Sequence, residues 1–265
     1  MEEVMEEVME ELMEEVMEEV VEEVRRSLTT TTDKYPRGSI EDDFNYGTNV
    51  STASVQVRMD FLRKVYSLLS LQLLLTTATS ALFLLCAPLK EYVHNSPAVV
   101  LVSALGSLVL LLVLFIYRHQ HPVNLYLLLT FTLLEAVSVA TTVTFYDYST
   151  VLQALVLTCA VFAGLTAFTF QSKRDFSKLG AGLFAGLLIL LIAGFSRLWF
   201  QWDSSDLLFS SLGAFLFCGF IVFDTFSLMK TLSPEEHVLA SINLYLDLLN
   251  LFMHLLRLLE ALKRH

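Results

Sequence analysis

Seven apolar stretches constrain the fold of this chain more than any other feature of its sequence. They occupy residues 65–87, 98–117, 123–145, 149–170, 179–200, 207–229 and 238–262. Each meets the requirement of about 20 residues for an α-helix to cross a hydrocarbon layer of about 30 Å. Because hydrocarbon offers no partners to backbone polar groups, such stretches must be helices or strands of a closed barrel, and they lack the alternation of barrel strands. With 55% hydrophobic residues, the sequence predicts an all-α polytopic membrane protein, a bundle of seven transmembrane helices.

The N-terminal region differs in composition from the rest of the chain. Residues 1–24 contain 12 of the 28 acidic residues and no lysine or arginine, so the remaining 16 acidic residues face 17 basic ones. Pairs of glutamate alternate there with pairs of apolar residues, and this period of four drifts around a helix without forming a coiled-coil seam. We interpret residues 1–34 as an acidic low-complexity extension and linker, disordered or an isolated helix. Residues 35–60 are predicted to be a cytosolic segment preceding a seven-helix domain of residues 61–265.

The basic residues beside the apolar stretches predict the orientation. If the N-terminus is cytosolic, eight flank the cytosolic side and four the far side. The first set is Arg58, Arg63, Lys64, Arg118, Lys173, Arg174, Lys178 and Lys230; the second is Lys90, Arg197, Lys263 and Arg264. The positive-inside rule therefore favours a cytosolic N-terminus. Lys263 and Arg264 do not fit this rule, which leaves open a re-entrant last segment.

Three carboxylates lie within the apolar stretches: Glu135, Asp224 and Asp247. A carboxylate in hydrocarbon costs about 2.5–3.5 kcal/mol even on lenient scales, so it normally faces the bundle interior or a water-filled path. A rise of 1.5 Å per residue places Asp224 about 7 Å and Asp247 about 14 Å below the same membrane face, whereas Glu135 lies near the middle. Two adjacent carboxylates in a low dielectric share a proton or bind a cation such as calcium. Asp224 and Asp247 are therefore the predicted ion-pathway pair and calcium site.

A polar stripe accompanies Asp247 along the last apolar stretch. Its members recur at helical spacing and are Asn243, Asp247, Asn250, His254 and Arg257. Asn243, Asn250 and His254, together with Glu135, are secondary pore candidates. The alternative for the asparagines is hydrogen bonding between helices.

The cysteines and histidines predict no cross-link or metal site. Cys86, Cys159 and Cys218 lie in apolar stretches, where each is expected to behave as a small buried hydrophobe. The histidines are scattered, without zinc-ligand spacing.

Five segments resemble the lifeguard branch of the transmembrane Bax inhibitor motif family. They are YPRGSIEDDFNYG at 35–47, FLRKVY at 61–66, QSKRDFSK at 171–178, CGFIVFDT at 218–225 and SINLYLDLLNLF at 241–252. The resemblance implies seven helices with a central last helix, and a calcium leak across Golgi or endoplasmic-reticulum membranes that lowers stored calcium and inhibits apoptosis. It also implies that Asp224 and Asp247 share a proton and that Arg118 latches onto Asp224.

The sequence thus predicts a pH-sensitive calcium leak channel, with calcium as the transported or regulatory ion and no other cofactor. Its expected partners are the lipid bilayer, other calcium channels or apoptosis regulators, and a second copy of the chain, but not nucleic acid. One alternative is an anti-apoptotic adaptor without a pore. Another is an intramembrane aspartyl protease, which the residues before Asp247 disfavour, since Leu244-Tyr-Leu246 replaces the Gly-x-Gly of those enzymes. We therefore expect no enzymatic activity.

The orientation can be checked at the Asn49-Val-Ser51 sequon. A cytosolic N-terminus does not meet the glycosyltransferase, so Asn49 should carry no glycan when the chain is produced in mammalian cells. Treatment with an endoglycosidase should leave the mobility of the protein unchanged. A shift that disappears in Asn49→Gln would instead place the N-terminus in the lumen.

Overall fold

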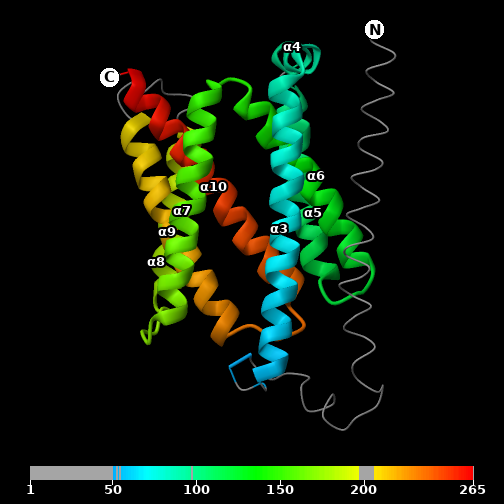
Figure 1. The fold of residues 1–265 in the computed structure, drawn as a ribbon, viewed down its shortest axis with the longest axis vertical. Helices are drawn as coiled ribbons and strands as arrows, with labels where there is room; N and C mark the ends of the chain where they lie inside the picture. The colour runs from blue at the N-terminus through cyan, green and yellow to red at the C-terminus, as the bar shows by residue number, and fades with distance from the viewer. Residues whose placement is uncertain (1–49, 52, 54, 97, 197–205, 265) are drawn as a thin grey trace. The chain divides into compact units, whose positions relative to one another are not determined.

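The computed structural model describes residues 50, 51, 53, 55–96, 98–196 and 206–264. The regular structure of these residues is helical throughout (Figure 1). The helices are α3 (Val55–Leu85), α4 (Ala87–Asn95), α5 (Ala98–Tyr117), α6 (Val123–Val143), α7 (Tyr148–Gln171), α8 (Leu179–Ser196), α9 (Asp206–Lys230) and α10 (His237–Arg264). Residues 1–34, most of the 35–60 segment, Asn49 and Arg197 lie outside the described part.

The predicted all-α polytopic membrane bundle is confirmed. Six of the described helices are long and apolar enough to cross a membrane, namely α3, α6, α7, α8, α9 and α10. α5, with 20 residues, is the seventh apolar helix, and its uninterrupted described stretch is Leu101–Tyr117. The helices follow the predicted apolar runs closely. α3 begins ten residues earlier than its run, and its first turns carry an Arg63–Asp60 ion pair of 3.7 Å.

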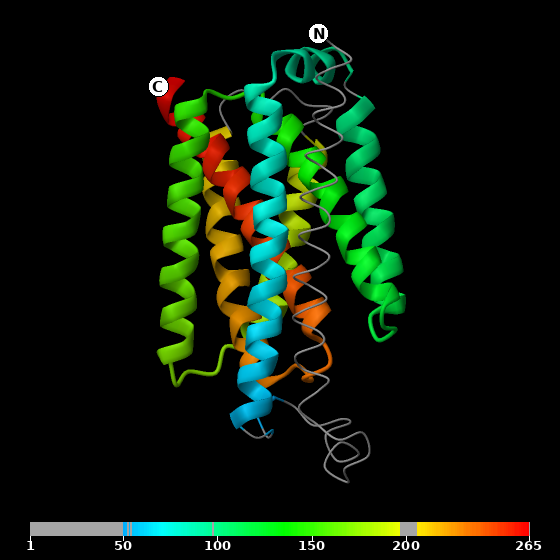
Figure 2. The same cartoon turned by 45° about the vertical axis from the view of Figure 1, so that its right-hand side comes forward.

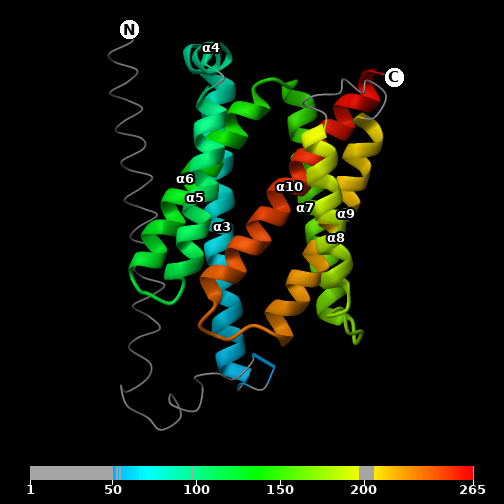
Figure 3. The same ribbon diagram turned by 180° about the vertical axis from the view of Figure 1, so that it is seen from behind.

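The last helix, α10, lies at the centre of the bundle. It crosses obliquely between α5 and α6 on one side and α7, α8 and α9 on the other (Figure 3), and it passes behind α3 in Figure 2. Of its most apolar 18 residues, 72% are buried, against none in α8. The expected central last helix is therefore confirmed.

α10 is a continuous helix of 28 residues rather than a re-entrant segment. It begins at the end of the bundle where α3 begins and where α5 connects to α6, which we call the Arg118 end. It finishes at the opposite end of the bundle, the end at which α4 also lies, and we call this the α4 end. At 1.5 Å per residue its length of about 42 Å exceeds the hydrocarbon thickness. The basic residues Lys263 and Arg264 thus lie at the α4 end.

Several hydroxyl side chains form hydrogen bonds within their own helices. Thr76, Thr132 and Thr158 each donate to the carbonyl four residues earlier, at 2.7–2.8 Å. This local bond removes the need for a partner on another helix. It explains how apolar stretches tolerate so many threonines.

The short helix α4 is absent from the sequence-based expectation. Pro88 cannot continue α3, because it lacks an N–H and restricts the residue before it, but it suits the first turn of a new helix. Cys86 is extended and begins α4. His94 then contacts Thr144 at 3.0 Å and stacks on Phe145, which fixes α4 over the end of α6.

The cysteines correct another expectation. Cys159 is exposed on the outside of the bundle, and Cys86 and Cys218 are half-buried. Apolar context predicted that each would be a buried hydrophobe, but a helix with lipid on one face is apolar there as well. Hydropathy therefore does not distinguish the lipid-facing side of a span from its packed side.

One glycine sets the distance between α9 and α10. His254 is 6% exposed and lies between Phe217 and Phe209, with ring centroids 5.6 Å from each. A Cβ atom added at Gly213 would overlap the imidazole ring of His254. The surrounding aromatic rings leave that imidazole little freedom to move.

We therefore expect Gly213→Ala to destabilise the protein by about 1–3 kcal/mol, the usual cost of overpacking. The matched control is Gly182→Ala in α8, where an added Cβ meets nothing within 4 Å. That variant should be neutral or stabilising by up to about 1 kcal/mol, since alanine favours helix. Thermal unfolding in detergent measures both, and equal stability of the two variants would contradict the packing argument.

Candidate functional site

The structure brings the two predicted aspartates together. The carboxyl groups of Asp224 in α9 and Asp247 in α10 lie close enough to form a side-chain hydrogen bond. Asp247 is buried, with 6% of its surface exposed, and Asp224 is half-buried. An ionised carboxylate has no proton to donate, so this bond requires one of the two groups to be protonated. A proton shared by the pair stays a prediction of the sequence analysis.

The surroundings of the pair make full ionisation unfavourable. The described ion pairs of arginines join other residues, Asp60, Glu236 and Glu260, and none reaches Asp224 or Asp247. Two neighbouring negative charges would thus stand uncompensated in a low dielectric. The pair needs a shared proton, or a cation in its place.

The pair also offers free oxygen atoms. Oδ2 of Asp247 and the hydroxyl of Thr225 are buried without a hydrogen-bond partner in the described part of the protein. Calcium takes six to eight oxygen ligands, which carbonyls and water supply in part. In the described ranges no cluster of three histidine, cysteine or acidic side chains could hold a metal ion. The two carboxylates alone therefore supply fewer ligands than a calcium ion takes.

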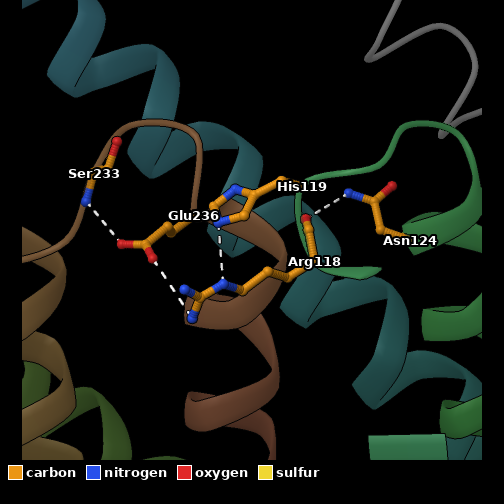
Figure 4. Close-up of polar contacts among 5 residues, drawn as sticks. All are labelled: Arg118, His119, Asn124, Ser233 and Glu236. Carbon is orange, nitrogen blue, oxygen red and sulfur yellow. Dashed lines mark hydrogen bonds and ion pairs between the residues drawn. The ribbon is translucent and has the colours of Figure 1, made fainter. Parts of the chain in front are cut away.

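Arg118 contacts a different acidic residue from the one expected. The sequence analysis paired it with Asp224, whereas its guanidinium lies 3.9 Å from a carboxylate oxygen of Glu236 (Figure 4). Its Nε donates to His119 at 3.0 Å, and the group also lies over the ring of Phe115. The difference arises because Glu236 stands in the α9–α10 connection at the Arg118 end, while Asp224 is bonded to Asp247 inside the bundle.

Glu236 is a residue that the sequence analysis missed. Its carboxylate also accepts from the backbone N–H of Ser233 at 3.1 Å (Figure 4). Ser-x-x-Glu before an apolar run is the signature of a capping box, and here it precedes α10. That pattern was available in the sequence. Arg118 thus connects the end of α5 to the turn that begins the central helix.

A further histidine, His121, lies at the Arg118 end. Burial lowers the pKa of His121 and nearby Lys64 lowers it further, whereas Glu235 acts in the opposite direction. The ring stacks on His237, with centroids 5.5 Å apart. Lys64 and Arg118 therefore supply the positive charge at this end near neutral pH.

The remaining pore candidates lie in three different settings. Glu135 is half-buried and hydrogen-bonded to Ser107 of α5, not to the aspartate pair. Asn250 donates to the carbonyl of Leu246 in its own helix at 2.8 Å, so its amide nitrogen does not link two helices. Asn243 is half-buried. His254 is buried with its Nδ1 unpartnered.

Comparison with known proteins gives the family. The family described as inhibitor of apoptosis-promoting Bax1 matches residues 58–264. The chain belongs to this Bax inhibitor family. It is 61% identical over 237 residues to protein lifeguard 4 of Mus musculus, covering 89% of this chain and all of that protein. It is 57% identical over 223 residues to the Golgi anti-apoptotic protein of vaccinia virus (strain Lister), covering 84% of this chain and 94% of the relative.

The Bax inhibitor family reaches well beyond animals and their viruses. Bax inhibitor 1 of Schizosaccharomyces pombe is 37% identical over 227 residues, covering 84% of this chain and 85% of the relative. The vaccinia relative is named as an anti-apoptotic protein and the S. pombe relative as a Bax inhibitor. Asp224, Asp247 and Arg118 all lie inside the range that the Bax inhibitor family matches.

The partner of Arg118 can be tested by a double-mutant cycle. Arg118→Ala and Glu236→Gln should show a coupling of about 0.5–1 kcal/mol in the free energy of unfolding, as for a partly exposed ion pair. The control is the neighbouring exposed residue Glu235, whose Gln variant should show no coupling to Arg118→Ala. Coupling of Arg118 to Asp224→Asn, and none to Glu236→Gln, would favour the Asp224 latch instead.

Proposed function

We propose that the chain is a calcium leak channel of intracellular membranes that lowers stored calcium and thereby inhibits apoptosis. The observation that carries this proposal is the hydrogen-bonded pair of Asp224 and Asp247 at the buried interface of α9 with the central helix. Carboxylates at membrane depth are costly, and they are retained where they serve an ion or proton path. The names of the relatives support the anti-apoptotic part.

The two carboxylates bind either a shared proton or a cation. With one proton shared, the pair carries one negative charge and a closed hydrogen bond. Loss of that proton leaves two carboxylates and the unpartnered Oδ2 of Asp247, which attract a divalent cation. Calcium passage is therefore linked to pH, because a proton and calcium compete for the same oxygen atoms.

The location and orientation belong to the same proposal. The vaccinia relative is named for the Golgi, and we assign this chain to the Golgi membrane and also to the endoplasmic reticulum, as a multi-pass protein. The excess of basic residues on one side places the N-terminus in the cytosol. The Arg118 end is then the cytosolic mouth.

Arg118 acts in this proposal as the latch of the mouth. In the present arrangement it holds Glu236 and so restrains the turn that begins α10. When the aspartate pair loses its proton, Asp224 becomes a competing anionic partner for the guanidinium. Exchange of Arg118 between Glu236 and Asp224 would couple the state of the pair to the position of α10.

The leak is tested by calcium flux into proteoliposomes of the purified protein. Asp247→Asn keeps the side-chain volume but removes the titratable pair, so we expect flux to lose its dependence on pH. The control is Glu260→Gln, on the same helix at the α4 end, where Glu260 pairs with Arg264 at 3.3 Å. This variant should keep the pH dependence of the wild type.

Two results would contradict the proposal. Unchanged pH-dependent flux in Asp247→Asn would remove the pair from the pathway. An absence of flux from folded wild-type protein would favour the adaptor without a pore.

A further inference from the structure

A second polar cluster lies within the bundle, where α10 faces α3 and α6. It combines side chains from four helices, and its members other than Glu135 are buried. They are Gln72 and Thr76 of α3, Ser107 of α5, Thr132 and Glu135 of α6, and Tyr245 of α10. We call this set the Glu135 ring.

Contacts between helices connect the members into a ring. The hydroxyls of Thr76 and Tyr245 are 2.7 Å apart, and Nε2 of Gln72 donates to Thr132 at 3.2 Å. Thr132 and Glu135 are three residues apart on α6, and Gln72 and Thr76 are four apart on α3, so each pair shares a helix face. Glu135 lies beside Ser107 of α5 and near Tyr245, and so belongs to the same set.

Most hydroxyl protons of the ring already take part in hydrogen bonds. Thr132 donates to the carbonyl of Leu128, and Thr76 donates to the carbonyl of Gln72, each at 2.8 Å. A hydroxyl has one proton, so Tyr245 must donate to Thr76, and its own oxygen is left as an acceptor. The proton of Ser107 serves either the Ala104 carbonyl at 2.9 Å or Glu135.

Acceptors therefore outnumber donors in the ring. Oε1 of Gln72 is buried without a partner, although its residue is only 3% exposed. The carboxylate of Glu135 has at most the Ser107 proton, and no described arginine, lysine or histidine forms an ion pair with it. Unpaired buried acceptors beside a carboxylate are costly, and a cation satisfies several of them at once.

We propose that the Glu135 ring binds one monovalent alkali cation, sodium or potassium. The charge of a monovalent cation matches that of the ring, because the one carboxylate, Glu135, neutralises one positive charge. A divalent ion would leave a net charge in the hydrocarbon region. The oxygen atoms of the ring also suit an alkali cation, because neutral oxygen ligands replace the hydration shell of such cations in membrane proteins. This site is separate from the aspartate pair, and its occupation needs no calcium flux.

Binding is measured on the full chain purified in detergent. Thermal unfolding is compared in sodium or potassium chloride and in N-methylglucamine chloride at equal ionic strength, alongside binding of radiolabelled sodium. We expect the alkali cation to raise Tm by about 3 °C and to saturate, as a ligand of the folded state does. Glu135→Gln should abolish both the shift and the binding, and Gln72→Leu should weaken binding about tenfold by removing one ligand.

Two controls separate this site from others. Glu91→Gln, in α4, removes an exposed carboxylate and should leave sodium binding unchanged. Asp247→Asn should also retain it, so loss of binding there, with retention in Glu135→Gln, would assign the cation to the aspartate pair and overturn the proposal. Wild-type protein without any alkali-cation dependence would mean that Glu135 carries a proton instead. A failed leak assay would not affect these results, because the binding is measured without a membrane gradient.

Discussion

The absence of water in the hydrocarbon region is the constraint on which this structure depends. Each polar group at that depth must find its partner within the protein, and α10 carries Asp247 and His254 buried among its apolar residues. The bundle meets this requirement by placing α10 at its centre, with α3, α6, α7 and α9 around it. Thr158 and Thr169 of α7 need no partner on another helix, because each hydroxyl donates to a carbonyl of its own helix. The central position of the last helix is thus a consequence of its polar side chains.

α10 also separates two polar regions. Tyr245 and Asp247 are two residues apart, which turns their side chains about 200° around the helix axis. Asp247 therefore meets Asp224 of α9, while Tyr245 meets Thr76 of α3. The carboxylates of the two regions do not form one cluster. Each must be neutralised by itself, the pair by a proton or a divalent ion and Glu135 by a single charge.

The sequence predicted those features that depend on length and period. Runs of about 20 apolar residues gave the spans, and the helical rise placed Asp224 and Asp247 in the same half of the membrane. It did not predict α4, because the start of a new helix at Pro88 has no apolar run of its own to mark it. It also did not give the partner of Arg118, since the counting of residues along single helices does not locate the turn that carries Glu236. The closure of the Glu135 ring depends on which faces of four helices meet, and no pattern within one helix contains that information.

α8 differs from the other spans in having no buried side chain, and it lies mainly against α9. Lipid accepts many apolar side chains equally well, so little restricts which of them stand along this helix. Its contact residues, Gly180 and Gly186, are the exceptions, because Phe223 and Leu216 fill the space where a Cβ would be. In related proteins the apolar residues of α8 should therefore be exchanged freely for one another, while its hydropathy and these two glycines are kept. It is also the helix through which the thickness and composition of the surrounding bilayer act most directly on α9, and so on Asp224.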